Sequence, residues 1–149
     1  MQIQTEQPKN GVDEHILVCL SSSPSNARII HTAAKMAKVL HAKFTAIYVQ
    51  TDSVESEKNR LRLEQNIQLA QGLGAEIVMT HGEDVPLQIS EYVRLSDVTK
   101  IVIGQSSARR RDRAITTKLM MRFESIESWM LAPLFAVVLG ITFDPCFKS

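Results

Sequence analysis

Residues 15–23 read His-Ile-Leu-Val-Cys-Leu-Ser-Ser-Ser, an apolar run that ends abruptly in three serines. The run has no alternation of polar and apolar residues, which is typical of a strand buried on both faces of a parallel sheet. Ser23 is a good helix N-cap, and Pro24 suits the first helical position because an N–H there has no helical partner. The helix that follows has one apolar stripe, formed by Ala27, Ile30, Ala34 and Ala37.

The same alternation of strand and helix continues along the chain. Four more apolar or β-branched segments predict strands, at residues 43–49, 76–80, 99–104 and 134–139. Three more helices are predicted from apolar stripes, formed by Leu63, Ile67, Ala70 and Leu73; by Val85, Ile89, Tyr92 and Val93; and by Ile115, Leu119, Phe123 and Ile126. This order predicts the α/β class: a doubly wound, five-stranded parallel sheet with helices on both faces.

The length and composition fit a single domain. At 149 residues, with 44% hydrophobic and 22% charged side chains, the chain resembles an ordinary globular protein. We expect one α/β domain over residues 14–143, a flexible polar leader over residues 1–13 and a short tail over residues 144–149. The longest uncharged stretch, residues 128–143, is shorter than the roughly 20 residues of a membrane-spanning helix. We therefore expect no membrane insertion of this segment.

Charge and residue usage exclude several classes of protein. A net charge of +1 excludes a strongly basic nucleic-acid binder. Cys19 and Cys146 are too few for a disulfide framework, which favours a reducing, cytoplasmic location. The four histidines lack the spacing of a metal site, and the sequence has neither a Walker-type loop nor a nucleophile elbow. We therefore expect no metal, no required cofactor, no nucleic-acid partner and no catalytic residue in this chain.

Two loops of the predicted sheet are placed to meet a ligand. In open parallel sheets, ligands bind beyond the carboxyl ends of the strands, where the strand order reverses. There the loop Ser21–Ser23 leads into a helix N-terminus, whose free N–H groups favour an anion. The loop after the fourth strand would lie beside it, and it supplies Gly104 for close approach and the hydroxyls of Ser106 and Ser107.

Nearby arginines could add positive charge to such a site. Arg28 lies one turn into the first helix, and the run Arg109–Arg111 follows the second loop. The arginine run is more consistent with a solvated loop than with a ligand phosphate, and the serines are equally consistent with a plain N-cap and turn. The residue pattern alone therefore indicates a pair of loops suited to phosphate and leaves the ligand open.

Three blocks of sequence carry a family resemblance, at residues 15–28, 32–37 and 44–48, and residues 99–104 fit the same family's fourth strand. Together they resemble the universal-stress-protein-like domain of the KdpD family, the membrane sensor histidine kinases of bacterial potassium regulation. The resemblance covers residues 13–105. It implies a universal-stress-protein-like fold and a sensory role that tunes potassium-uptake signalling.

The resemblance also implies a ligand and partners. Members of this family bind cyclic di-AMP, and the matching positions here are Cys19, Ser21, Ser23, Phe44, Thr45, Ala46 and Tyr48. Other domains of a membrane-anchored parent kinase are the implied partners, and a homodimer is allowed. The phosphoacceptor and ATP-lid elements of a histidine kinase are missing from these 149 residues, so the chain would be the sensory piece.

The sequence departs from the ATP-binding universal stress proteins at two places. Those proteins share a Gly-x-x-Gly motif after the fourth strand and an Asp at the end of the first strand. Here Ala108 stands at the second glycine's place, and Leu20 and Ser21 replace the Asp, which disfavours ATP relative to cyclic di-AMP. Two alternatives stay open: an ATP- or AMP-binding homodimer, and an interaction module without a ligand.

Overall fold

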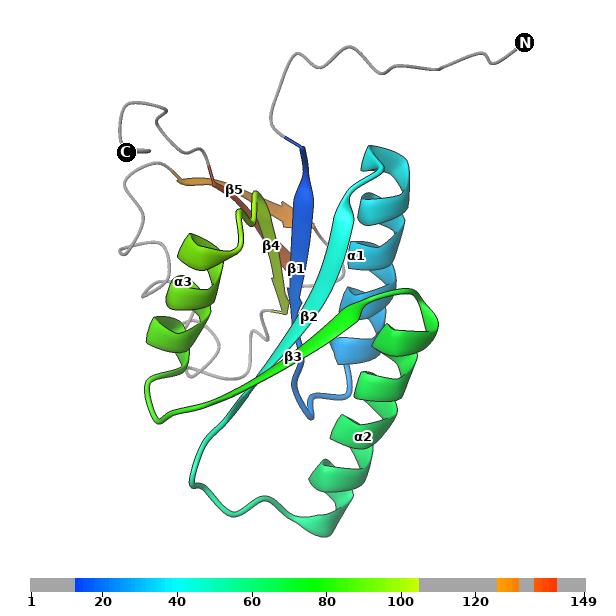
Figure 1. Cartoon of the computed structure of the whole chain (residues 1–149). Helices are drawn as coiled ribbons and strands as arrows, with labels where there is room; N and C mark the ends of the chain where they lie inside the picture. The colour runs from blue at the N-terminus through cyan, green and yellow to red at the C-terminus, as the bar shows by residue number, and fades with distance from the viewer. Residues whose placement is uncertain (1–12, 105–125, 132–135, 142–149) are drawn as a thin grey trace, which may run out of the picture.

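A computed structural model describes residues 13–104, 126–131 and 136–141 of the chain (Figure 1). The elements, in chain order, are β1 (His15–Cys19), α1 (Asn26–Leu40), β2 (Lys43–Gln50), α2 (Glu57–Gly72), β3 (Glu76–His81), α3 (Val85–Leu95), β4 (Lys100–Gly104), β5 (Ile126–Leu131) and β6 (Ala136–Ile141). They form one sheet with the order β3-β2-β1-β4-β6-β5. The α/β class, the first four predicted strands and the first three predicted helices are confirmed.

The sheet is parallel only over β1 to β4, so the prediction of five parallel strands is wrong in its last strand. β6 overlaps the predicted strand at 134–139 but pairs antiparallel with β4, with Val138 opposite Val102. Ile126, which we expected on a fourth helix, instead begins β5, which pairs antiparallel with β6. A short connection forces an antiparallel pair, because parallel neighbours need a long crossover. The rest of the predicted fourth helix, residues 115–125, lies outside the described residues.

Helices cover both faces of the parallel part of the sheet. In Figure 1, α1 and α2 lie on one side of the sheet and α3 lies on the other. Alternate residues of β1 serve the two cores: Ile16 and Val18 pack with α1 and α2, while Leu17 packs with α3. All three side chains are fully buried, which confirms that the unbroken apolar run marks a two-sided strand.

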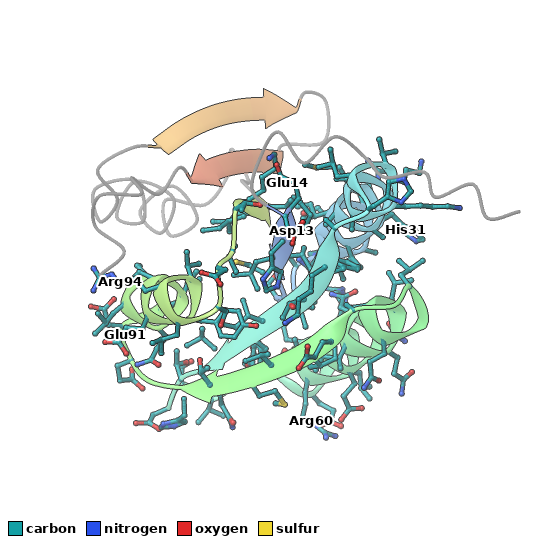
Figure 2. The ribbon with its side chains drawn as sticks, turned by 45° about the horizontal axis from the view of Figure 1, so that its top comes forward. Asp13, Glu14, His31, Arg60, Glu91 and Arg94 are labelled. Carbon is teal, nitrogen blue, oxygen red and sulfur yellow. The ribbon has the colours of Figure 1, made fainter. Side chains whose placement is uncertain are left out.

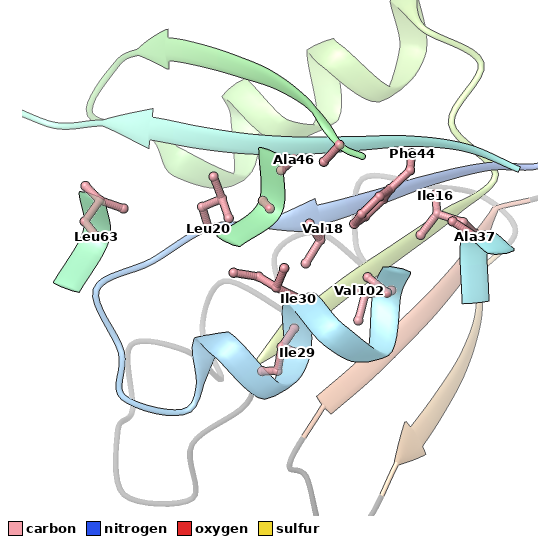
Figure 3. Close-up of a cluster of buried hydrophobic side chains, with 13 residues drawn as sticks. Ile16, Val18, Leu20, Ile29, Ile30, Ala37, Phe44, Ala46, Leu63 and Val102 are labelled. Carbon is pink, nitrogen blue, oxygen red and sulfur yellow. The ribbon is translucent and has the colours of Figure 1, made fainter. Parts of the chain in front are cut away.

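The larger core lies between the sheet and the pair α1 and α2, and Figure 3 shows it in close-up. Its buried residues are Ile16, Val18, Leu20, Ile29, Ile30, Ala33, Ala37, Phe44, Ala46, Leu63, Ala70, Ala75 and Val102. The small alanines on α1 let the helix approach the sheet closely, so that the larger side chains from β1 and β2 fill the space between them.

The start of α1 differs from the prediction. The helix begins at Asn26, and its N-cap is Ser25 rather than Ser23. The Ser23 hydroxyl accepts a hydrogen bond from the backbone N–H of Ser25 at 3.3 Å, so it stabilises the preceding turn instead. Asp84 caps α3, because its carboxylate accepts the N–H of Leu87 at 3.1 Å.

Among the residues that the structure describes, no helix combines the length and apolar character needed to cross a membrane.

Candidate functional site

A cleft of about 230 Å³ opens at the carboxyl ends of β1, β2 and β4. β1 lies between β2 and β4, and the crossovers from β1 and from β3 pack on opposite faces, so this is the point at which the strand order reverses. The lining residues are Cys19, Leu20, Ser21, Ser22, Ser23, Ser25, Asn26, Ile29, Ile47, Tyr48, Val49, Thr51, Ser53, Glu55, Val85, Ile89, Ile103 and Gly104. A cleft therefore lies where the sequence predicts a ligand.

The serine loop after β1 is held in place by a buried amide from α1. Asn26 is 2% exposed, and its Nδ2 donates to the carbonyl of Cys19 at 3.0 Å. Its Oδ1 accepts the N–H of Ser21 at 3.2 Å. One side chain thus satisfies a donor and an acceptor that the end of β1 would otherwise leave unpaired.

The same loop is also fastened to α2. Asn66, which is 5% exposed, donates from Nδ2 to the carbonyl of Ser21 at 2.8 Å. Arg62 donates from its guanidinium to the carbonyl of Ser22 at 3.2 Å. Because the loop carbonyls are paired with the helices, the serine hydroxyls are the groups of the loop best placed to donate to a ligand. The hydroxyl oxygen of Ser21 accepts the N–H of Ser23 at 3.2 Å, and its own hydrogen can still be donated.

The wall formed by β2 offers an aromatic surface. Tyr48 is half-buried in the cleft, and burial, followed by the negative charge of Glu55, raises the pKa of its phenol. Cys19 lies at the end of β1, and burial raises the pKa of its thiol to about 12. Both groups therefore stay protonated near neutral pH, and Cys19 offers a small neutral surface rather than a nucleophile.

The described residues that line the cleft carry a net negative charge. Among the lining residues of the described chain, Glu55 alone carries a formal charge. It lies in the loop between β2 and α2, and its Oε1 accepts the hydroxyl hydrogen of Ser22 at 3.3 Å. Recognition of a phosphate by these residues would therefore depend on hydroxyl and backbone N–H donors.

Five of the residues singled out from the sequence are brought together in the cleft: Cys19, Ser21, Ser23, Tyr48 and Gly104. Gly104 is required by a close approach, because a Cβ built on it would lie 2.4 Å from Cδ1 of Ile29. A side chain at this position would therefore force Ile29 or the end of β4 to shift.

The other predicted residues do not line the cleft within the described chain. Phe44 and Ala46 are buried in the core, as Figure 3 shows, and Thr45 is fully buried on the opposite face of β2. Phe44 and Tyr48 share a face of β2 but lie about 13 Å apart along the strand. Arg28 is exposed on α1. Ser106, Ser107 and Arg109–Arg111 lie outside the described residues.

The residues that support the loop were not predicted from the sequence, although a signal for one of them is present. Asn66 stands in the apolar stripe of α2, three residues after Leu63 and four before Ala70, where a polar side chain needs a buried partner. The sequence gives no comparable signal for Glu55, because a charged residue in a polar loop does not stand out from its neighbours.

A second polar cluster lies at the other end of β1, far from the cleft, and Figure 2 looks onto this end with Glu14 labelled. His15 is 4% exposed, and its Nδ1 lies 2.8 Å from the carbonyl oxygen of Ser96. A carbonyl only accepts, so Nδ1 carries the proton and the neutral ring's Nε2 accepts from the hydroxyl of Thr45 at 2.8 Å. Thr45 thus completes a structural network here rather than facing the cleft.

We expect His15 to make the domain sensitive to acid. Burial is the largest influence on its imidazole and lowers its pKa. Below about pH 6.5, the unfolded chain takes up a proton that the folded domain binds less readily, so stability falls as the pH falls. Urea unfolding between about pH 7 and pH 5 should show a smaller loss of stability for His15→Gln than for the wild type.

The exposed His31, labelled in Figure 2, provides the matched control, because His31→Gln should keep the wild-type dependence on pH. Parallel curves for the wild type and His15→Gln would contradict the assignment of the acid sensitivity to His15.

Comparisons with known proteins find sequence similarity to KdpD sensor proteins and a fold shared with universal stress proteins. The sensor protein KdpD of Clostridium acetobutylicum is 45% identical over 96 residues, which cover 64% of this chain and 11% of that protein. KdpD of Escherichia coli is 29% identical over 97 residues, with the same two coverages. The chain thus spans about 11% of the length of these two relatives. No protein-family model matches the chain.

Solved structures of universal stress proteins share the fold. The universal stress protein of Archaeoglobus fulgidus in complex with dAMP has a TM-score of 0.51 and 17% identity, covering 77% of this chain and 95% of that one. A universal stress protein in complex with cAMP has a TM-score of 0.55 and 16% identity, covering 77% and 94%. At this level of identity, the agreement concerns the fold alone.

Proposed function

Because the chain carries a universal-stress-protein-like domain similar in sequence to the KdpD sensor proteins, we propose that it is a regulatory domain that binds a nucleotide in the cleft. The observation that carries the proposal is the hollow at the carboxyl ends of β1 and β4, lined by Ser21, Ser23 and Gly104. Two structurally similar universal stress proteins are themselves complexes with dAMP and cAMP, which supports an adenine nucleotide.

The serine loop is suited to a phosphate. It leads into the N-terminus of α1, a helix of 15 residues whose positive dipole end favours an anion. Asn26 and Asn66 hold the loop before any ligand arrives. A preorganised loop loses less conformational entropy on binding, so more of the interaction free energy contributes to affinity.

The remaining walls are suited to a nucleobase. Tyr48 offers an aromatic face, while Val49, Val85 and Ile89 add apolar surface from β2 and α3. Adenine is flat and largely apolar on its faces, so it can stack on the ring or lie on the aliphatic side chains.

Cyclic di-AMP is the ligand that we favour within this class. Each of its phosphodiesters carries a single negative charge, whereas ATP carries several charges on adjacent phosphates. Among the described lining residues no cation offsets such a concentration of charge. In a KdpD-type protein, occupancy of this cleft would tune the signalling of a parent kinase that controls potassium uptake.

Calorimetric titration of the chain with cyclic di-AMP, ATP and cyclic di-GMP tests the proposal. We expect saturable binding of cyclic di-AMP and much weaker binding of the other two. The second candidate, an ATP- or AMP-binding stress protein, is favoured by the complexes of its structural neighbours with mononucleotides. Binding of ATP without binding of cyclic di-AMP would establish that candidate instead.

Replacing Ser23 by alanine should weaken nucleotide binding by about 1.5–3 kcal/mol, because a hydroxyl that meets a phosphate makes a hydrogen bond to a charged group. The measurement is the change in dissociation constant by calorimetry. Thr32→Ala is the control, since it also removes a hydroxyl from this region, but that hydroxyl bonds the carbonyl of Arg28 and does not line the cleft. An affinity unchanged by Ser23→Ala would remove this hydroxyl from the site.

A further inference from the structure

The wall of the cleft formed by the loop between β2 and α2 carries an unexpected charge. Glu55 contributes a carboxylate to a cleft whose other described lining residues are all uncharged. In Figure 1 this loop lies at the same end of the sheet as the serine loop that follows β1. A carboxylate is an unusual choice beside a phosphate site, because two negative groups repel each other strongly in a partly desolvated cleft.

The carboxylate contacts the serine loop directly. Its Oε1 accepts the hydroxyl hydrogen of Ser22 at 3.3 Å, which joins the loop between β2 and α2 to the loop after β1. Burial and then the charge of Glu55 raise the pKa of Tyr48, and both residues line the cleft. The negative charge of Glu55 would therefore act on a ligand in the part of the cleft that Tyr48 and Ser22 line.

We propose that Glu55 is a specificity-determining residue that excludes terminal phosphates from this wall and accepts a hydroxyl of the nucleoside there instead. The proposal rests on nucleotide binding in the cleft, as argued above. In dinucleotide-binding Rossmann folds, an acidic residue about 20 residues after the glycine-rich turn accepts a ribose hydroxyl. By analogy, Glu55 in the loop after β2 would accept one here. The phosphates would then face Ser21, Ser23 and Gly104.

The charge of the phosphate decides the size of the effect. A phosphodiester carries one negative charge, whereas a terminal phosphate carries close to two at neutral pH. Placing the additional charge within several ångströms of Glu55 weakens binding by about tenfold at the dielectric of a surface cleft. Because the carboxylate is exposed to solvent, the effect should shrink as the salt concentration rises.

The test compares cyclic di-AMP with its ring-opened linear form, which has the same two nucleosides but ends in a terminal phosphate. Calorimetry on the full chain measures both affinities for the wild type and for Glu55→Gln, which removes the charge and keeps the size. We expect the preference for the cyclic form to fall about tenfold in Glu55→Gln, mainly through tighter binding of the linear form. Glu64→Gln, an exposed charge removal on α2 outside the cleft, should leave the preference unchanged.

The role of Glu55 would be overturned if Glu55→Gln preferred cyclic di-AMP over the linear form as strongly as the wild type does. It would also be overturned if Glu64→Gln lost the preference to the same extent as Glu55→Gln. Weaker binding of cyclic di-2′-deoxy-AMP than of cyclic di-AMP to the wild type, with no such difference in Glu55→Gln, would support the ribose contact. An equal deoxy penalty in both proteins would overturn it. If the wild type binds neither cyclic di-AMP nor the linear form, the proposed function itself has failed.

Discussion

Replacing Asn26 by alanine is expected to lower the free energy of unfolding by about 2–3 kcal/mol and to weaken nucleotide binding at the same time. The side chain is 2% exposed, and it pairs both the carbonyl of Cys19 and the N–H of Ser21. Alanine would leave both backbone groups without these partners where β1 ends. The serine loop would then lose the geometry that presents Ser21 and Ser23 to the cleft.

Urea unfolding followed by circular dichroism measures the stability, and calorimetry measures the binding. Asn59→Ala is the matched control, because Asn59 lies in the first turn of α2, where its backbone N–H bonds the Ser56 hydroxyl and is kept in the variant. We expect the control to change stability by less than about 0.5 kcal/mol. Equal effects of the two substitutions would contradict the role assigned to the Asn26 amide.

Replacing Gly104 by alanine should cost about 1–3 kcal/mol of stability, because the new Cβ would meet Cδ1 of Ile29 at 2.4 Å. Ile29 is fully buried, so its side chain can move only by displacing neighbours in the core. Since Gly104 also lines the cleft, a shift of β4 against α1 should weaken ligand binding as well.

A double-mutant cycle separates the clash with Ile29 from any other destabilising effect of a side chain at the end of β4. Ile29→Val removes the clashing Cδ1, so the alanine at position 104 should be less costly in that background. Gly72→Ala provides the matched glycine control, because a Cβ there meets nothing within 4 Å, and α2 should be unchanged or slightly more stable. A cost of Gly104→Ala that is the same in both Ile29 backgrounds would exclude the proposed contact.

Much of the fold could be predicted because local patterns and packing agree. The unbroken apolar run at residues 16–18 specifies a two-sided strand, and Asp84 with Pro86 specifies the start of α3. The direction of the last strand could not be predicted, because the apolar pattern of residues 136–141 is the same for a parallel and an antiparallel neighbour. The short connection from β5 to β6 explains their antiparallel pairing, but it does not set the direction of β6 relative to β4.

The candidate site was predictable where it depends on the ends of strands. Ser21, Ser23 and Gly104 follow directly from the rule that ligands bind at the point where strand order reverses. Phe44 and Thr45 came from a sequence resemblance, and the structure places them in the core and in the network of His15. Asn66 is visible as a polar residue in an apolar stripe, but the pattern does not name its partner, the carbonyl of Ser21, which is 45 residues away. Asn26 contacts the backbone five and seven residues before it, and periodicity gives no signal for such a contact.

If a nucleotide occupies the cleft between the serine loop and the end of β4, adding it should perturb the residues that line this cleft. The most direct test adds cyclic di-AMP to the isotopically labelled chain and follows the backbone amide resonances by NMR. We expect the largest shifts on residues 21–26 and on Gly104, while the distant network around His15 and Thr99 changes little. Shifts centred on that network, or no shifts with any adenine nucleotide, would contradict binding in this cleft.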